Sequence, residues 1–181
     1  MRTMLLSSTC VAVILATSAL FAGEESIALD KLPKAVLEAV KKRFPKAEIV
    51  EAAKETEGDK VEFEVSIKDG EAKIDVTLTP EGKITLIEKE IAAKDLPKAI
   101  TEALNTKYEK ATFKTVEEIT KVADGKEAVD YYEVLLVTAD KKTLEVQVTL
   151  DGKIKNVEEK KEEKEEKKKE NKKEEKKEDK K

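Results

Sequence analysis

The 181-residue chain contains no histidine and no tryptophan, and its single cysteine, Cys10, lies near the amino terminus. The chain therefore has no imidazole base, no internal disulfide and no Cys/His ligand set for zinc, copper or haem. The six glycines are isolated from one another, so no glycine-rich phosphate-binding loop is present. We expect no cofactor, and only carboxylates, lysines, tyrosines and hydroxyls remain for catalysis.

These remaining groups do not predict an enzyme. Paired carboxylates such as Glu62 and Glu64 could serve glycoside cleavage, but 42% of the residues are charged, so neighbouring glutamates occur by chance. Asp69, Asp124 and Asp151 each precede a glycine without the oxygen-rich spacing of a calcium loop, which is typical of turns. We expect neither catalysis nor a specific metal site.

The first 22 residues have the composition of an export signal. Arg2 is followed by an apolar run at 11–15 and then by small residues. The apolar stretch is too short for a membrane span. Cleavage after Ala19 or after Ala22 fits the pattern, and Cys10 lies too early for a lipoprotein anchor. We predict a periplasmic or secreted protein with no membrane span after cleavage.

Residues 158–181 consist almost entirely of lysine and glutamate. This segment has no apolar side chains to bury, so packing cannot offset its ordering entropy. Like charges mostly recur at four-residue spacing although some i,i+3 pairs are favourable, so we predict a disordered or transiently helical tail. Residues 23–157 carry a net charge of −6. That disfavours a nucleic-acid role, because phosphate contact needs a clustered basic surface.

The chain between signal and tail contains a duplicated unit. LPKAVLEAVKKRFPKA at 32–47 recurs 64 positions later as LPKAITEALNTKYEKA at 96–111, with eight of sixteen positions identical. IDVTLTPEGKI at 74–84 matches LEVQVTLDGKI at 144–154, a spacing of 70, so the second copy carries six extra residues. We place them near 123–128, and predict one repeat at 23–92 and another at 93–157.

Each repeat combines a helical pattern with alternating strands. Apolar residues at three- to four-residue spacing predict a helix at about 31–44 with Asp30 as its N-cap, and a second helix with Asp95 as its N-cap. Apolar and polar residues then alternate, which predicts strands joined by turns such as Asp69-Gly70. The expected strands lie at 47–55, 61–67, 74–79 and 84–88, and then at 111–122, 128–138, 142–150 and 153–158.

We therefore predict an α+β fold of two tandem repeats, each a helix plus a four-stranded antiparallel meander. Both helices would pack on one face of a curved, eight-stranded sheet. The other face would be open to solvent. Alternation places these polar residues on the open face: Glu62, Glu64, Ser66, Asp75, Thr77, Thr79, Glu145, Gln147 and Thr149.

The strand predicted at 128–138 is apolar on both sides. Alignment of the repeats sends Tyr132, Val134 and Leu136 toward the helix and leaves Tyr131, Leu135 and Val137 on the open face. These three residues either pack at a repeat seam or loop, or form a partner-binding patch. Our candidate partner-binding residues are Tyr131, Leu135, Val137, Glu62, Glu64, Thr77 and Gln147.

These motifs resemble the PepSY-like domains, and more narrowly their beta-lactamase-inhibitor-like group. The resemblance rests on the LPKA helix start, the Phe-Pro-Lys-Ala helix end, two alternating strands and the closing PEGKI or LDGKI turn, over nearly all of 28–158. It implies helix-plus-meander units, export, and binding rather than catalysis; the related inhibitors grip their target with the concave sheet face. This chain lacks their tryptophans and disulfides, so beta-lactamase inhibition itself is not expected to transfer.

The predicted function is binding of a protein or peptide partner in the cell envelope. A more specific form of this prediction is that binding inhibits the partner. The alternative is an envelope structural or stress-buffering protein without a discrete site, in which the tail acts as a solubiliser. The partner's identity and the oligomeric state do not follow from the sequence.

Overall fold

The computed structural model describes residues 23–160; the predicted signal peptide and residues 161–181 of the predicted tail lie outside this part. In chain order its elements are β1 (Gly23–Ser26), a 3-10 helix (Leu29–Lys31), α1 (Lys34–Arg43), β2 (Glu48–Glu57), β3 (Lys60–Asp69), β4 (Ala72–Leu78), β5 (Ile84–Glu90), a second 3-10 helix (Ala93–Asp95), α2 (Lys98–Lys107), β6 (Thr112–Ala123), β7 (Lys126–Val137), β8 (Thr143–Thr149) and β9 (Ile154–Lys160).

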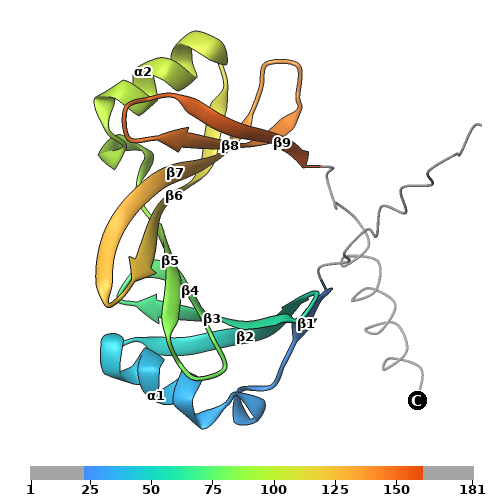
Figure 1. The fold of residues 1–181 in the computed structure, drawn as a ribbon. Coiled ribbons are helices and arrows are strands. Elements are labelled where there is room, and N and C mark those ends of the chain that lie inside the picture. The colour runs from blue at the N-terminus through green and yellow to red at the C-terminus, as the bar shows by residue number, and fades with distance from the viewer. Residues whose placement is uncertain (1–22, 161–181) are drawn as a thin grey trace, which may run out of the picture.

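All nine strands form one antiparallel sheet in which the spatial order follows the chain order, from β1 to β9. The sheet bends into an open arc, and α1 and α2 both lie on its convex side, near the two ends (Figure 1). The predicted α+β class is therefore confirmed. Within residues 23–160, no helix lies on the concave face of the arc.

The sheet is longer than predicted at both edges. β1, which our prediction lacked, pairs with β2 from Gly23 opposite Thr56 to Ser26 opposite Ala53. Its sequence, GEES, has no apolar alternation, so only the ladder with β2 marks it as a strand. The sheet therefore has nine strands rather than eight. At the other edge β9 continues to Lys160, so residues 158–160 are strand rather than tail.

Each α-helix begins after a Leu-Pro pair, not at the predicted aspartate. Asp30 lies within the first 3-10 helix, and Pro33 is the N-cap of α1 with extended backbone angles (φ −54°, ψ 137°). Asp95 and Pro97 take the same places before α2. The predicted aspartate caps are therefore wrong. Proline disfavours helical angles in the residue before it, so Leu32 is extended and α1 starts after the proline.

The two helices cover two separate apolar cores. Val36 and Val40 of α1 pack within the first core, and Ile100 and Leu104 of α2 within the second. Every second residue of the strands beneath them completes these cores. In the second core these residues include Tyr132, Val134 and Leu136, which face the helix as predicted.

The turns after β4 and β8 lie directly against the helices. Gly82 has a φ of +81°, and a Cβ built on it would lie 2.4 Å from the carbonyl oxygen of Ala35 in α1. Gly152, with a φ of +84°, would place its Cβ 2.8 Å from the carbonyl oxygen of Ala99 in α2. A glycine and an alanine thus meet at the same place in both halves, and a Cβ on either glycine would lie too close to the helix backbone.

We expect Gly82→Ala to destabilise the protein by roughly 2–4 kcal/mol, because the new methyl group adds a backbone clash to the strain of a positive φ. Gly70→Ala is the matched control: Gly70 also has a positive φ (+66°), but a Cβ there meets nothing within 4 Å. About 1 kcal/mol is expected for the control. Urea unfolding measures both losses. Equal losses of unfolding free energy in the two variants would show that Gly82 is not in tight contact with α1.

Candidate functional site

The concave face is formed by the strand residues that alternate with the core. Since Val65, Val76, Val134 and Val146 are buried under the helices, their strand neighbours point the other way. The sheet register places all seven predicted candidates on this face, but in two separate groups. Glu62, Glu64 and Thr77 lie on β3 and β4, whereas Tyr131, Leu135, Val137 and Gln147 lie on β7 and β8. The strands β5 and β6 separate the groups.

The apolar group on β7 is neither fully buried nor freely exposed. Tyr131, Leu135 and Val137 are all half-buried. Tyr131 lies directly opposite Ile119 of β6, which is completely buried although it is on the concave side. The Lys155 ammonium lies 4.6 Å from the centre of the Tyr131 ring. Burial, followed by repulsion from Glu133 and other carboxylates, raises the pKa of Tyr131 to about 12. We call Tyr131, Leu135 and Val137 the apolar row.

Five carboxylates fill the space between the two groups; the sequence predicted only Asp75 on this face and missed the other four. Asp75 lies directly opposite Glu88 across β4 and β5. In the next row, Glu90 lies opposite Glu117, and Glu117 opposite Glu133, across β5, β6 and β7. We call these five residues the acidic rows. Like charges directly opposite each other destabilise a sheet, so this arrangement has a cost in folding free energy.

Lysines neutralise the margins of this face but not its centre. Lys60 lies 2.9 Å from Glu62, Lys73 lies 3.2 Å from Glu90, and Lys160 lies 3.0 Å from Glu145. Across residues 23–160, no ion pair within 4 Å involves Asp75, Glu88 or Glu117. The centre of the concave face is therefore a region of uncompensated negative charge.

Burial and mutual repulsion shift the protonation of these carboxyls. The pKa of Glu88 rises to about 7 and that of Glu117 to about 7, and burial is the largest cause for both. Repulsion from Glu117 is the next cause for Glu88, and repulsion from Glu133 the next for Glu117. Burial also raises the pKa of Glu133, although Nε2 of Gln147 donates a 3.0 Å hydrogen bond to its Oε2. Near neutral pH Glu88 and Glu117 are therefore partly protonated.

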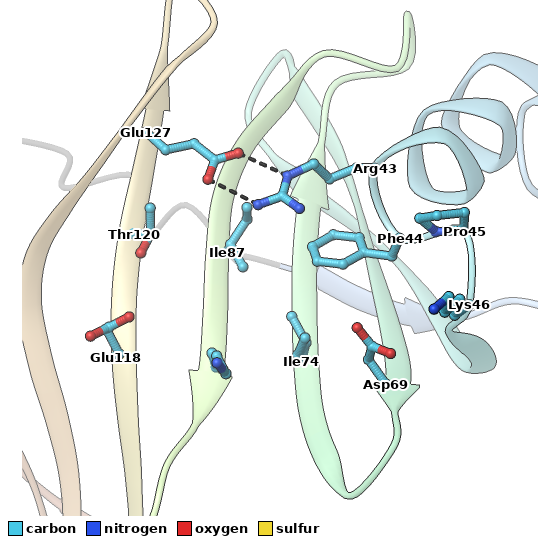
Figure 2. A pocket seen from close by; sticks show the side chains of 11 residues that line it. Arg43, Phe44, Pro45, Lys46, Asp69, Ile74, Ile87, Glu118, Thr120 and Glu127 are labelled. Carbon is cyan, nitrogen blue, oxygen red and sulfur yellow. Dashed lines mark hydrogen bonds and ion pairs between the residues drawn. The ribbon is translucent and has the colours of Figure 1, made fainter. Parts of the chain in front are cut away.

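Apart from the concave face, the structure has a pocket of about 400 Å³ on the convex side, where the two halves meet. We call this pocket the hollow. Figure 2 shows it between the end of α1 and the β6–β7 hairpin. Nε and Nη2 of Arg43 donate hydrogen bonds of 2.9 and 3.0 Å to the two carboxylate oxygens of Glu127. The guanidinium lies 4.7 Å from the ring centre of Phe44. Glu118, which also lines the hollow, accepts a 2.9 Å hydrogen bond from the Tyr132 hydroxyl.

This hollow depends on the extra residues of the second half. β6 and β7 have 12 residues each, against 10 each for β2 and β3. The longer hairpin carries Glu127 to Arg43, and it packs Val122 against the first core. The charged lining is balanced, with Arg43, Lys46 and Lys89 set against Asp69, Glu118 and Glu127. We therefore interpret this contact as a clamp between the halves and not as a ligand site.

No group of three or more carboxylates within residues 23–160 is arranged to hold a metal ion. The part of the chain that the structure describes has no helix long and apolar enough to cross a membrane.

The family model described as "Putative beta-lactamase-inhibitor-like, PepSY-like" matches the chain twice, at residues 22–87 and 82–156. The chain belongs to this PepSY-like family. The resemblance inferred from the LPKA and PEGKI motifs is thus confirmed. The two matches correspond to the two helix-and-sheet halves of the structure.

Solved structures of similar fold come from Bacteroides. A BLIP-like protein from Bacteroides fragilis has 16% identity and a TM-score of 0.52, over 69% of this chain and 84% of that one. A DUF2874 family protein from Bacteroides uniformis has 15% identity and a TM-score of 0.57, over 70% and 88%. A structure described as "putative periplasmic proteins" from Bacteroides eggerthii has 13% identity and a TM-score of 0.58, over 70% and 88%. At these identities the similarity shows the fold alone. A comparison with curated proteins finds no match.

We expect the unfolding free energy of this PepSY-like protein to increase as the pH falls from about 8 to about 5. The folded-state pKa of Glu88 and Glu117, about 7, exceeds the ordinary value of 4.5. The folded state therefore holds protons that the unfolded state releases, and stability is lost as the pH rises through 7. Glu117→Gln should raise stability near pH 8 by about 1 kcal/mol, allowing for solvent screening, and flatten the profile. Glu71→Gln, in an exposed turn, should change neither in the same urea titrations.

We also expect the clamp on the convex side to contribute a measurable coupling. A double-mutant cycle of Arg43→Ala and Glu127→Ala should give about 0.5–1 kcal/mol, because the pair is bidentate but partly exposed. The cycle cancels the separate loss of Arg43 packing on Phe44. The more exposed Lys34–Glu38 pair, at 3.6 Å, is the control and should give less. No excess over the control would refute the clamp.

Proposed function

We propose that the chain is an exported, non-catalytic binding protein that holds a protein or peptide partner on the concave face of its sheet. The supporting observation is that both helices lie on the convex side, so that no helix or strand of residues 23–160 covers the opposite face (Figure 1). On that face the apolar row lies beside the acidic rows. Apolar side chains set among polar ones are typical of protein interfaces.

The size and curvature of the face suit a macromolecule more than a small ligand. Nine strands spaced about 4.8 Å apart extend over roughly 40 Å. A face of this length accommodates a standard interface of roughly 800 Å² on each partner. Because the surface is concave, a protruding loop or helix of the partner fits it better than a flat surface does.

The pKa values of the carboxyls in the acidic rows support a role without catalysis. Acid–base catalysis by two carboxyls requires environments that push their pKa values apart, so that one is an acid while the other is a base. Glu88 and Glu117 instead share a pKa of about 7 for the same reasons, burial and neighbouring carboxylates. Residues 23–181 also contain no histidine or cysteine. We therefore interpret the acidic rows as a charged surface.

Export is proposed from residues 1–22, whose order of a basic residue, an apolar run and small residues is that of a cleaved signal. The description of the Bacteroides eggerthii protein as periplasmic is consistent with this proposal.

The proposal predicts that the apolar row carries binding energy. Replacing Tyr131 and Leu135 by alanine should lower partner recovery at least about ten-fold, because aromatic and apolar residues at the centre of an interface each contribute roughly 1–2 kcal/mol or more. The measurement is affinity capture of the exported protein from its own envelope extract, followed by quantitative mass spectrometry.

The control for this experiment is Leu29→Ala/Leu150→Ala, which removes two exposed leucines away from the apolar row, 40% and 51% exposed. This variant should recover the partner as well as the parent protein does. Circular dichroism establishes that both variants are folded. Equal recovery by the Tyr131→Ala/Leu135→Ala variant would contradict the proposed site. Failure of the parent to retain any protein would favour the structural, stress-buffering alternative.

A further inference from the structure

We infer that residues 161–181 of this chain dock on the concave face and set their lysines against the acidic rows. The segment would then occupy the surface to which a partner binds. That consequence rests on the proposed function, whereas the contact itself does not.

The described chain ends at the edge of this surface. Lys160 is the last residue of β9, the edge strand, and it lies opposite Thr143 of β8. Its ammonium lies 3.0 Å from a carboxylate oxygen of Glu145 and 3.2 Å from one of Glu158. By register both carboxylates belong to the concave face. The segment that follows therefore starts from a lysine that already binds this face.

The spacing of the lysines matches the distance to the acidic rows. Glu133, Glu117 and Glu88 lie on β7, β6 and β5, two to four strands from β9, which is roughly 10–20 Å at the usual strand spacing. The triplet Lys167, Lys168 and Lys169 follows Lys160 by seven to nine residues. A chain of seven to nine residues spans at most roughly 23–32 Å. The first cluster of lysines is thus close enough along the chain to reach the central carboxylates.

The charges are complementary on the part of the segment that reaches this far. Residues 167–181 hold nine lysines against five acidic residues, whereas residues 162–166, nearer to β9, hold four glutamates and one lysine. Opposite them, Asp75, Glu88 and Glu117 have no ion pair within residues 23–160. The lysines would supply the charge that the centre of the face lacks.

Because the segment is attached to the sheet, weak ion pairs between its lysines and the acidic rows are enough to hold it on the concave face. One exposed ion pair is worth roughly 0–1 kcal/mol, which would not hold a free peptide. A segment attached at Lys160 is present near the face at an effective concentration on the order of millimolar. The contact is therefore expected to be exchangeable and to weaken as salt shortens the Debye length, to about 3 Å at 1 M.

The experiment locates the segment by paramagnetic relaxation enhancement in the full chain. Because Cys10 is the only cysteine, a Cys10→Ser, Asn171→Cys chain carries one spin label within the segment. At low salt, the amide signals of Glu117, Glu133 and Glu145 should lose intensity at least about two-fold relative to the reduced label. Signals of Val36 and Ile100 in the two helices should not.

Two variants test the charge complementarity. Glu117→Gln/Glu133→Gln, placed in the labelled chain, should abolish most of the intensity loss, as should salt at about 0.5 M. Glu38→Gln/Glu102→Gln is the matched control, since it also removes two carboxylates but from exposed positions on α1 and α2. It should leave the intensity loss unchanged.

Three outcomes would overturn the inference: no intensity loss, an equal loss on both faces, or a loss that survives the Glu117→Gln/Glu133→Gln change. The segment could also bind the concave face of a second copy of the chain. A mixture of isotope-labelled chains with spin-labelled, isotope-free chains tests for this contact between chains. Intensity loss in that mixture would refute docking within one chain. Since no partner is added, these results do not depend on whether the proposed binding function holds.

Discussion

The burial of one side-chain row per strand beneath a ten-residue helix is the constraint on which the structure depends. A helix of that length is about 15 Å long and covers only a few strands, which are about 4.8 Å apart. Two such helices cover the two ends of a nine-stranded sheet, and each seals its own core. Because both helices occupy the convex side, no element of residues 23–160 covers the other face, as a direct consequence of how the cores are closed.

Folding stability alone does not explain the residues on that uncovered face. Carboxylates directly opposite each other weaken strand pairing. Burial, followed by repulsion from neighbouring carboxylates, raises the pKa of Glu88 and Glu117. Glutamine at either position would keep the shape and the β-sheet hydrogen bonds while removing the repulsion. A surface that retains a destabilising charge pattern at its centre is the kind of compromise expected where binding, and not stability, determines the residue.

The sequence predicted the elements better than it predicted the site. Strict alternation in β3, β4 and β7 was sufficient to orient Glu64, Thr77 and Tyr131 correctly. Glu88, Glu90 and Glu117 were missed because bulges interrupt the alternation in β5 and β6. Register shifts occur between Thr77 and Leu78 at the β4–β5 pairing and near Lys114 and Thr120 in β6. The opposition of Glu90, Glu117 and Glu133 also depends on pairing between the two halves, which no local pattern encodes. The sequence also did not predict β1, because only its pairing with β2 identifies it as a strand.

The four extra residues of the β6–β7 hairpin, two in each strand relative to β2 and β3, help to explain why two similar units form one arc. Two independent units could meet at any angle permitted by β5–β6 pairing alone. The longer β6–β7 hairpin extends over the first half, where Val122 joins the first core and Glu127 binds Arg43 at the end of α1. These contacts lie on the convex side, so they restrict rotation between the halves without covering the concave face. An insertion elsewhere, for example in the β3–β4 turn, would have lengthened a free loop and left the junction unsupported.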